Sequence, residues 1–121
     1  MEYFRRLIEI GLKVITGSDS SWNHYKLGNT ILETECLVMS GYSPMQGLLS
    51  VTSESAKSIG IDHIVGTIEP GKEADIIVVD GNPAERLNDL WNVTEVFLAG
   101  QRVDRGSKES LAATRQWPPD G

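Results

Sequence analysis

The stretch that most constrains the fold is Leu12 to Trp22, which reads LKVITGSDSSW. Its first five residues are mostly apolar and predict a short buried strand, and Gly17 opens a polar loop that contains Asp19. In α/β proteins, ligands and catalytic groups lie just past the C-terminal ends of strands. Asp19 is therefore a candidate metal ligand or general base. The residues alone leave a second interpretation open, in which Asp19 is a turn residue or a helix N-cap.

Helical patterns surround this stretch. Apolar residues at helical spacing predict one helix over Tyr3–Ile10 with Gly11 as its end, and another over Asn29–Ser40. Ser43 and Pro44 have the residue types of an N-cap and a first helical residue, so they predict a third helix. A fourth helix is expected from Thr52 or Ser53 to Gly60, which gives three helices in close succession.

From Ile61 onward the pattern changes to that of strands and turns. Short strands are expected at residues 65–68, 74–80, 93–99 and 102–104, with turns at 69–72 and 100–101. Leu87, Leu90 and Trp91 are expected to pack inward from the segment before the third strand. The chain thus divides into residues 1–60, α/β material with one strand, residues 61–104, a small β-sheet, and a polar tail over 105–121. A single parallel strand cannot form a sheet, so neither part looks complete.

Composition narrows the class of protein. The 121 residues suit about one domain, and the net charge of −6 argues against a nucleic-acid partner or an anionic membrane. No apolar run approaches the roughly 20 residues of a membrane span, and the charged N-terminus does not resemble a signal peptide. The single cysteine, Cys36, excludes an intramolecular disulfide and fits a cytoplasmic setting. We expect Cys36 to be a small buried core residue.

Five motifs occur in a specific order. They are VITGSD at 14–19, MSGYSP at 39–44, TSESAKSIG at 52–60, VGTIEPGKEADIIVVDGNP at 65–83 and VTEVFLAGQRV at 93–103. Together they resemble the C-terminal end of the metal-dependent amidohydrolase superfamily, closest to its imidazolonepropionase- and prolidase-like branch. The resemblance covers about residues 3–105.

The resemblance implies a fold and a site. Complete members are (β/α)8 barrels with a metal site at the C-terminal face and a small β-sandwich beside the barrel. This chain would be an α/β fragment, the last βα portion of the barrel plus the second half of the sandwich. Asp19 would be the aspartate that binds metal and shuttles a proton to and from the attacking water. Ser20, Trp22 and His24 are substrate-binding candidates, with loop packing open for Trp22 and an exposed position for His24. Asp75 is expected to accept a hydrogen bond from the backbone or from Lys72.

The sequence departs from the family in its metal ligands. Its only histidines are His24 and His63, the latter expected at the surface, and no His-x-His pair is present. A zinc site needs at least three protein ligands. The resemblance therefore implies a divalent metal, zinc by preference, that is held in the complete enzyme mostly by residues not in this sequence. We expect no activity from this chain alone, because such a constellation acts as a unit.

Three functions follow from these observations. The first is a part of a hydrolase that acts on carbon–nitrogen bonds of a small-molecule substrate, either a non-peptide amide or a dipeptide of the prolidase type. The second is a non-catalytic docking or oligomerisation module that pairs through the exposed strands 12–16 and 74–79, as a homo-oligomer or with a complementary N-terminal barrel part. The third is an unrelated α+β ligand-binding domain, for which the motif match would be accidental.

Overall fold

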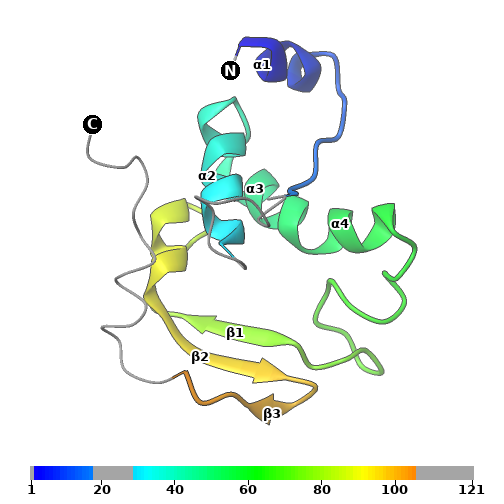
Figure 1. The fold of residues 1–121 in the computed structure, drawn as a ribbon, viewed down its shortest axis with the longest axis vertical. Helices are drawn as coiled ribbons and strands as arrows, with labels where there is room; N and C mark the ends of the chain where they lie inside the picture. Colours follow the sequence, from blue (N-terminus) through cyan, green and yellow to red (C-terminus); the bar gives the residue numbers. More distant parts are fainter. Residues whose placement is uncertain (1, 18–28, 106–121) are drawn as a thin grey trace, which may run out of the picture.

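The computed structural model describes residues 2–17 and 29–105 (Figure 1). Its elements, in chain order, are α1 (Glu2–Glu9), α2 (Thr30–Met39), α3 (Pro44–Val51), α4 (Ser53–Ser58), β1 (Ile76–Val79), the 3₁₀-helix η1 (Leu87–Asn92), β2 (Val93–Leu98) and β3 (Gln101–Arg102). Figure 1 shows the sheet below the helices, with β1 nearest to them and β3 farthest away. No helix in these two ranges is long and apolar enough to cross a membrane.

Helices α2, α3 and α4 follow one another with short connections, as predicted. The start of α3 is fixed by a capping box, in which the Gln46 N–H donates to Ser43 Oγ at 3.2 Å and the Ser43 N–H donates to Gln46 Oε1 at 2.8 Å. Pro44 occupies the first helical position, where its missing N–H costs no hydrogen bond. The predicted N-cap and first residue of this helix are therefore confirmed.

The sheet has three antiparallel strands in the order β1-β2-β3. Ile76 pairs with Phe97 and Val78 with Glu95, and an irregularity between Val78 and Val79 ends the regular register. Leu98 pairs with Gln101, so the β2–β3 hairpin has a two-residue loop. The short strand predicted at 102–104 is thus present as β3, and the turn predicted at 100–101 lies one residue earlier, at 99–100.

The hairpin loop explains this shift. Both loop residues have positive φ, 48° at Ala99 and 77° at Gly100, as a type I′ turn requires. Alanine rarely adopts such a φ. The Asp75 carboxylate accepts the Ala99 N–H at 2.8 Å, so a neighbouring strand end supports the strained residue. The predicted backbone hydrogen bond to Asp75 is thereby confirmed.

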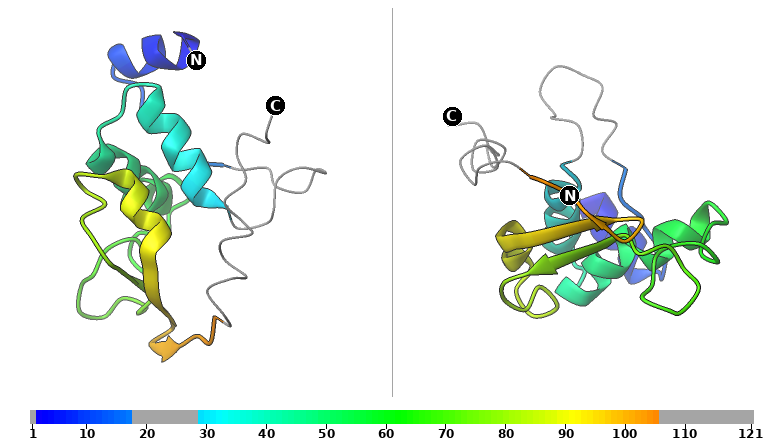
Figure 2. Two further views of the ribbon diagram at one scale, coloured as in Figure 1. Left: turned by 90° about the vertical axis from the view of Figure 1, so that its left-hand side faces the viewer. Right: turned by 90° about the horizontal axis from the view of Figure 1, so that it is seen from below.

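The core lies between the helices and η1, and Figure 2 shows η1 beside α2. Its buried apolar residues are Leu37, Ala56, Leu87 and Leu90. A Cβ built on Gly47 of α3 would lie 3.0 Å from Thr34 Cγ2 and 3.1 Å from Val38 Cγ2 of α2, so the small residue lets these two helices approach closely. Trp91 of η1 donates its Nε1–H to Glu35 Oε1 of α2 at 2.6 Å. The inward packing expected of Leu87 and Leu90 is confirmed.

The predicted strand at 12–16 is not found. Residues 12–17 have no regular secondary structure, and no strand of the described ranges lies beside them. The Tyr42 hydroxyl instead binds the backbone of Val14, accepting its N–H at 2.8 Å and donating to its carbonyl at 3.2 Å. A side chain thus satisfies backbone groups that a neighbouring strand would otherwise pair.

The predicted strand at 65–68 is also wrong. Gly66 has a φ of 99°, which is outside the β region, and the N–H groups of Ile64 and Val65 both donate to the Ile61 carbonyl. The segment is therefore a series of turns.

The prediction for Cys36 is wrong as well, because this residue is exposed. The buried face of α2 is formed by Thr34 and Leu37. Successive helical residues are rotated by about 100° around the helix axis. Cys36 lies between Thr34 and Leu37 in the sequence, but it therefore lies on a different face of the helix. Helix α1 has no buried residue, although its predicted bounds are nearly those observed. The boundary near residue 60 remains a prediction, and the described sheet forms a single layer.

Candidate functional site

The four residues predicted to bind metal or substrate lie outside the described residues. They are Asp19, Ser20, Trp22 and His24. The structure instead describes the segment that leads to them, residues 10–17, and the helices against which that segment lies.

This leading segment is anchored at two successive residues. Besides the Val14–Tyr42 hydrogen bonds described above, Lys13 Nζ lies 2.7 Å from Glu54 Oε2. The hydrogen bond to Glu54 raises the pKa of Lys13, and the hydrogen bonds from Lys13 and then Lys57 lower the pKa of Glu54. Both shifts favour the charged pair. Sequence reasoning missed Tyr42 as a contact of this segment, since only the fold brings residues 28 positions apart together.

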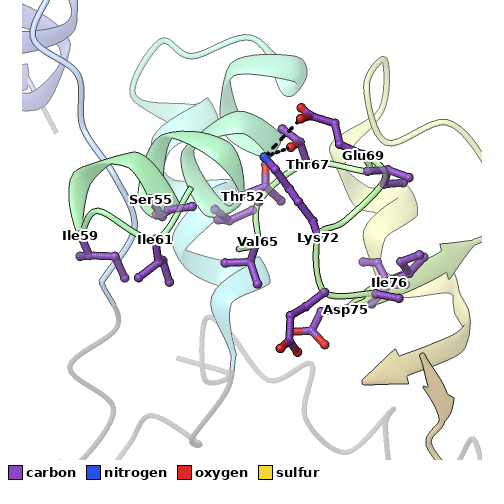
Figure 3. Close-up of a pocket in the computed structure, with 17 residues that line it drawn as sticks. Thr52, Ser55, Ile59, Ile61, Val65, Thr67, Glu69, Lys72, Asp75 and Ile76 are labelled. Atoms are coloured by element: carbon purple, nitrogen blue, oxygen red, sulfur yellow. Dashed lines mark hydrogen bonds and ion pairs between the residues drawn. The ribbon is translucent and has the colours of Figure 1, made fainter. Parts of the chain in front are cut away.

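A cleft of about 530 Å³ lies between α4, the turns at 61–72 and β1 (Figure 3). Its wall is mostly apolar, and Figure 3 shows Thr67, Glu69 and Lys72 together on one side of it. The apolar side chains include Val51, Ala56, Ile59, Ile61, Val65, Ile68, Ile76 and Ile77. Lys72 Nζ donates to Thr67 Oγ1 at 2.5 Å and lies 3.6 Å from Glu69 Oε2, so its charge is used within the cleft wall. Neither the sequence pattern nor the motifs indicated this cleft.

Asp89 is a buried carboxylate that sequence reasoning also missed. Its Oδ2 accepts the Asn82 N–H at 2.8 Å and the Arg86 Nη2–H at 3.0 Å. The backbone hydrogen bond from Asn82 is the main cause of a lowered pKa, and Arg86 adds to it. A Cβ on Gly81 would overlap this carboxylate. Asp89 therefore holds the Gly81–Asn82 turn and is not available to a ligand.

The described residues do not fit a metal site. Among them, no three His, Cys, Asp or Glu side chains are grouped so that they could hold a metal ion. His63 is exposed, as predicted. The pKa of Cys36 is raised, chiefly by desolvation of its thiol and then by Glu33 and Glu35, although the residue as a whole is exposed. Its thiol therefore stays protonated at neutral pH and is a poor metal ligand or nucleophile.

Comparison with known proteins identifies the family. The Amidohydrolase family matches residues 1–103, which is most of the chain. This chain belongs to the amidohydrolase family. It is 33% identical over 76 residues to an imidazolonepropionase from Geobacillus kaustophilus, a match that covers 61% of this chain and 18% of that protein.

Solved structures support the fold assignment. A Xaa-Pro dipeptidase with bound methionine matches with a TM-score of 0.75 and 35% identity, over 84% of this chain and 25% of that chain. Phenylurea hydrolase B matches with a TM-score of 0.76 and 26% identity, over 93% of this chain and 28% of that chain. The helices and three-stranded antiparallel sheet described above therefore match part of amidohydrolase structures. The chain spans between 18% and 28% of the length of these three proteins.

Proposed function

We propose that this chain is the C-terminal part of a metal-dependent hydrolase of carbon–nitrogen bonds, comprising the end of the barrel and half of the accompanying β-sandwich. The family match over residues 1–103 is the observation that carries this proposal. The names of its relatives, imidazolonepropionase, Xaa-Pro dipeptidase and phenylurea hydrolase, favour a small amide or dipeptide as substrate. We place the complete enzyme in the cytoplasm.

Asp19 is the proposed reactive residue. Its carboxylate takes a proton from the attacking water and returns it to the leaving nitrogen. It is also a proposed ligand of a divalent metal, zinc by preference, whose other ligands are not supplied by the described residues. Ser20, Trp22 and His24 would line the substrate pocket. The contacts of Lys13 and Val14 support this assignment, because they hold the segment that leads directly to Asp19.

Complementation tests the proposal. The chain is co-expressed with the N-terminal part of a related imidazolonepropionase that carries its His-x-His pair, and hydrolysis of an amide and dipeptide panel is measured together with metal content. We expect hydrolysis only from the pair, and Asp19→Asn should lower its rate by roughly 10²- to 10⁴-fold. Asp62→Asn, a change of the same kind at an exposed residue, is the control and should have no effect. Full activity of the Asp19→Asn pair would refute the role of Asp19.

A second candidate function is a docking module, and one observation favours it. The sheet has no buried residue in β1, β2 or β3, and Ile77 of β1 is 52% exposed. An apolar sheet with a free edge strand is a template for pairing with another chain. This function requires no chemistry from Asp19. Sedimentation velocity of the isolated chain at micromolar concentration tests the simplest form, a homo-oligomer, which a monodisperse monomer would contradict.

A further inference from the structure

The Tyr42 hydroxyl occupies both backbone groups of one residue in the segment that leads to Asp19. It accepts the Val14 N–H at 2.8 Å and donates to the Val14 carbonyl at 3.2 Å. In an extended chain the N–H and carbonyl of one residue point to the same side, and a strand on that side would bind them both. The hydroxyl and such a strand therefore cannot bind Val14 at the same time.

The backbone of Tyr42 is fixed by the two helices that it connects. Its N–H donates to the Leu37 carbonyl of α2 at 3.1 Å. The next residue, Ser43, is the N-cap of α3 and belongs to its capping box. The hydroxyl and Val14 are therefore separated by rotation of the Tyr42 side chain or by movement of residues 12–16, without any change in the helices.

The segment itself is held by polar contacts and not by burial. A cleft of about 240 Å³ lies between the segment and the helices, and Val14, Tyr42 and Leu49 are among the residues that line it. None of residues 10–17 is buried, and Leu12 is 51% exposed. Because little apolar surface is covered at this contact, the segment can leave the hydroxyl without opening a packed core.

The second anchor of the segment places no demand on the backbone. Lys13 Nζ lies 2.7 Å from Glu54 Oε2, so this contact joins two side chains only. The N–H and carbonyl groups of residues 12–16 remain available for pairing while the ion pair is formed. The two anchors therefore differ, because the ion pair is compatible with a strand at 12–16 and the Tyr42 hydroxyl is not.

The residues of the segment favour the state that Tyr42 blocks. Val14, Ile15 and Thr16 are β-branched and prefer strands, yet residues 12–17 have no regular secondary structure in this chain. A strand forms only where a neighbour supplies the hydrogen bonds, and here one side chain supplies those of Val14. The segment thus has two alternative states that compete for the same backbone groups.

We propose that Tyr42 is a reversible edge cap, a side chain that binds Val14 in the isolated chain and is displaced when residues 12–16 pair as a strand in the complete enzyme. The proposal rests on the proposed function, which supplies the pairing strand. Asp19 follows Val14 by five residues, so release of the cap sets when the backbone before Asp19 becomes part of a sheet. Until then the cap closes one side of the segment to other strands.

The rate of association with the rest of the barrel tests the cap. The N-terminal part of a related imidazolonepropionase is labelled with fluorescein and mixed with the full chain in a stopped-flow instrument, and fluorescence anisotropy is followed. Tyr42→Phe removes the hydroxyl and keeps the ring, so it should associate about threefold to tenfold faster. Tyr3→Phe, the same change at a residue that is 82% exposed, should have no effect. Glu54→Gln, which removes the ion pair, should not accelerate association.

Amide exchange at Val14 shows whether the hydroxyl is displaced. In the isolated chain this amide should exchange faster in Tyr42→Phe than in the wild type. In the complex it should exchange slowly and equally in both, because a strand has then replaced the hydroxyl. A hydroxyl that stayed on Val14 in the complex would instead leave exchange faster in Tyr42→Phe there as well, which would overturn the proposal.

The remaining outcomes separate the cap from the proposed function. Hydrolysis by the pair with equal association rates for wild type and Tyr42→Phe would overturn the cap and leave the proposed function standing. Faster association of Tyr42→Phe without hydrolysis by any pair would support the cap and contradict the proposed chemistry. Equal acceleration by Glu54→Gln would assign the effect to general loosening of the segment and overturn the cap. Association of neither chain would overturn both.

Discussion

The helical layer and the sheet of this chain differ in how well they are covered. Helices α2, α3 and α4 each contribute two buried residues, and η1 contributes three. The three strands contribute none, even though β1 reads IIVV. Within the described residues, the helices therefore pack on one another, whereas both faces of β1 stay at least partly exposed.

The largest expected difference in stability is between two leucine-to-alanine variants, one in the helical layer and one in the sheet. Leu37→Ala in α2, where the leucine is 7% exposed, should destabilise the chain by about 2–5 kcal/mol through lost burial and a cavity. Leu98→Ala at the end of β2, where the leucine is 61% exposed, should change the free energy of unfolding by no more than about 0.5 kcal/mol. Urea denaturation followed by circular dichroism measures both. Equal losses would mean that the sheet is as well packed as the helices.

Two glycines in the connection between the regions sharpen the comparison. A Cβ on Gly66 would lie 2.8 Å from Ala56 Cβ and 3.2 Å from Ser53 Cα, at a φ of 99°. Gly66→Ala should therefore cost about 2–4 kcal/mol, from overpacking and from the left-handed backbone together. Gly71 has a similar φ of 91° and open space around it, so Gly71→Ala should cost only about 1–2 kcal/mol. Thermal unfolding of both variants separates close packing from backbone strain.

A smaller effect is expected where the helical layer holds the segment leading to Asp19. Tyr42→Phe removes both hydrogen bonds to Val14 and should cost about 1 kcal/mol. Amide exchange at Val14 should become faster, while exchange within α3 stays unchanged. Unchanged exchange at Val14 would show that the segment is held without Tyr42.

The smallest effect at neutral pH is expected at Asp89, because an amide oxygen can still accept the Asn82 N–H. The folded-state pKa of Asp89 is lowered, so its contribution to stability is complete above the unfolded-state value of about 3.9 and is lost as the pH falls through the lower folded-state value. Asp89→Asn should therefore flatten the decline in stability below about pH 4. Denaturation midpoints between pH 2 and 7 measure this change. An equally steep decline in the variant would exclude Asp89 as a source of acid sensitivity.

Local signals in the sequence predicted the helices and the three strands of the sheet. Ser43 with Pro44 predicted the start of α3, and the alternating run at 93–99 predicted β2, because both depend on residues close in sequence. The strand at 12–16 was wrong because a strand needs a neighbour, and here Tyr42 takes that place. The cleft beside β1 depends on contacts between distant segments, which no local pattern contains. Asp89 was missed although its partners, Asn82 and Arg86, lie only seven and three positions before it. The predicted site around Asp19 remains a prediction, since it lies outside the described residues.

Amide hydrogen exchange of the isolated chain tests the central claim most directly, that the helical layer is covered and the sheet edge is not. We predict slow exchange at Leu37, intermediate exchange at Val78, which pairs with Glu95 of β2, and rapid exchange at Ile77, whose N–H faces away from β2. Exchange at Ile77 as slow as at Leu37, in a chain shown to be monomeric, would contradict the account, because the edge of β1 would then already be covered.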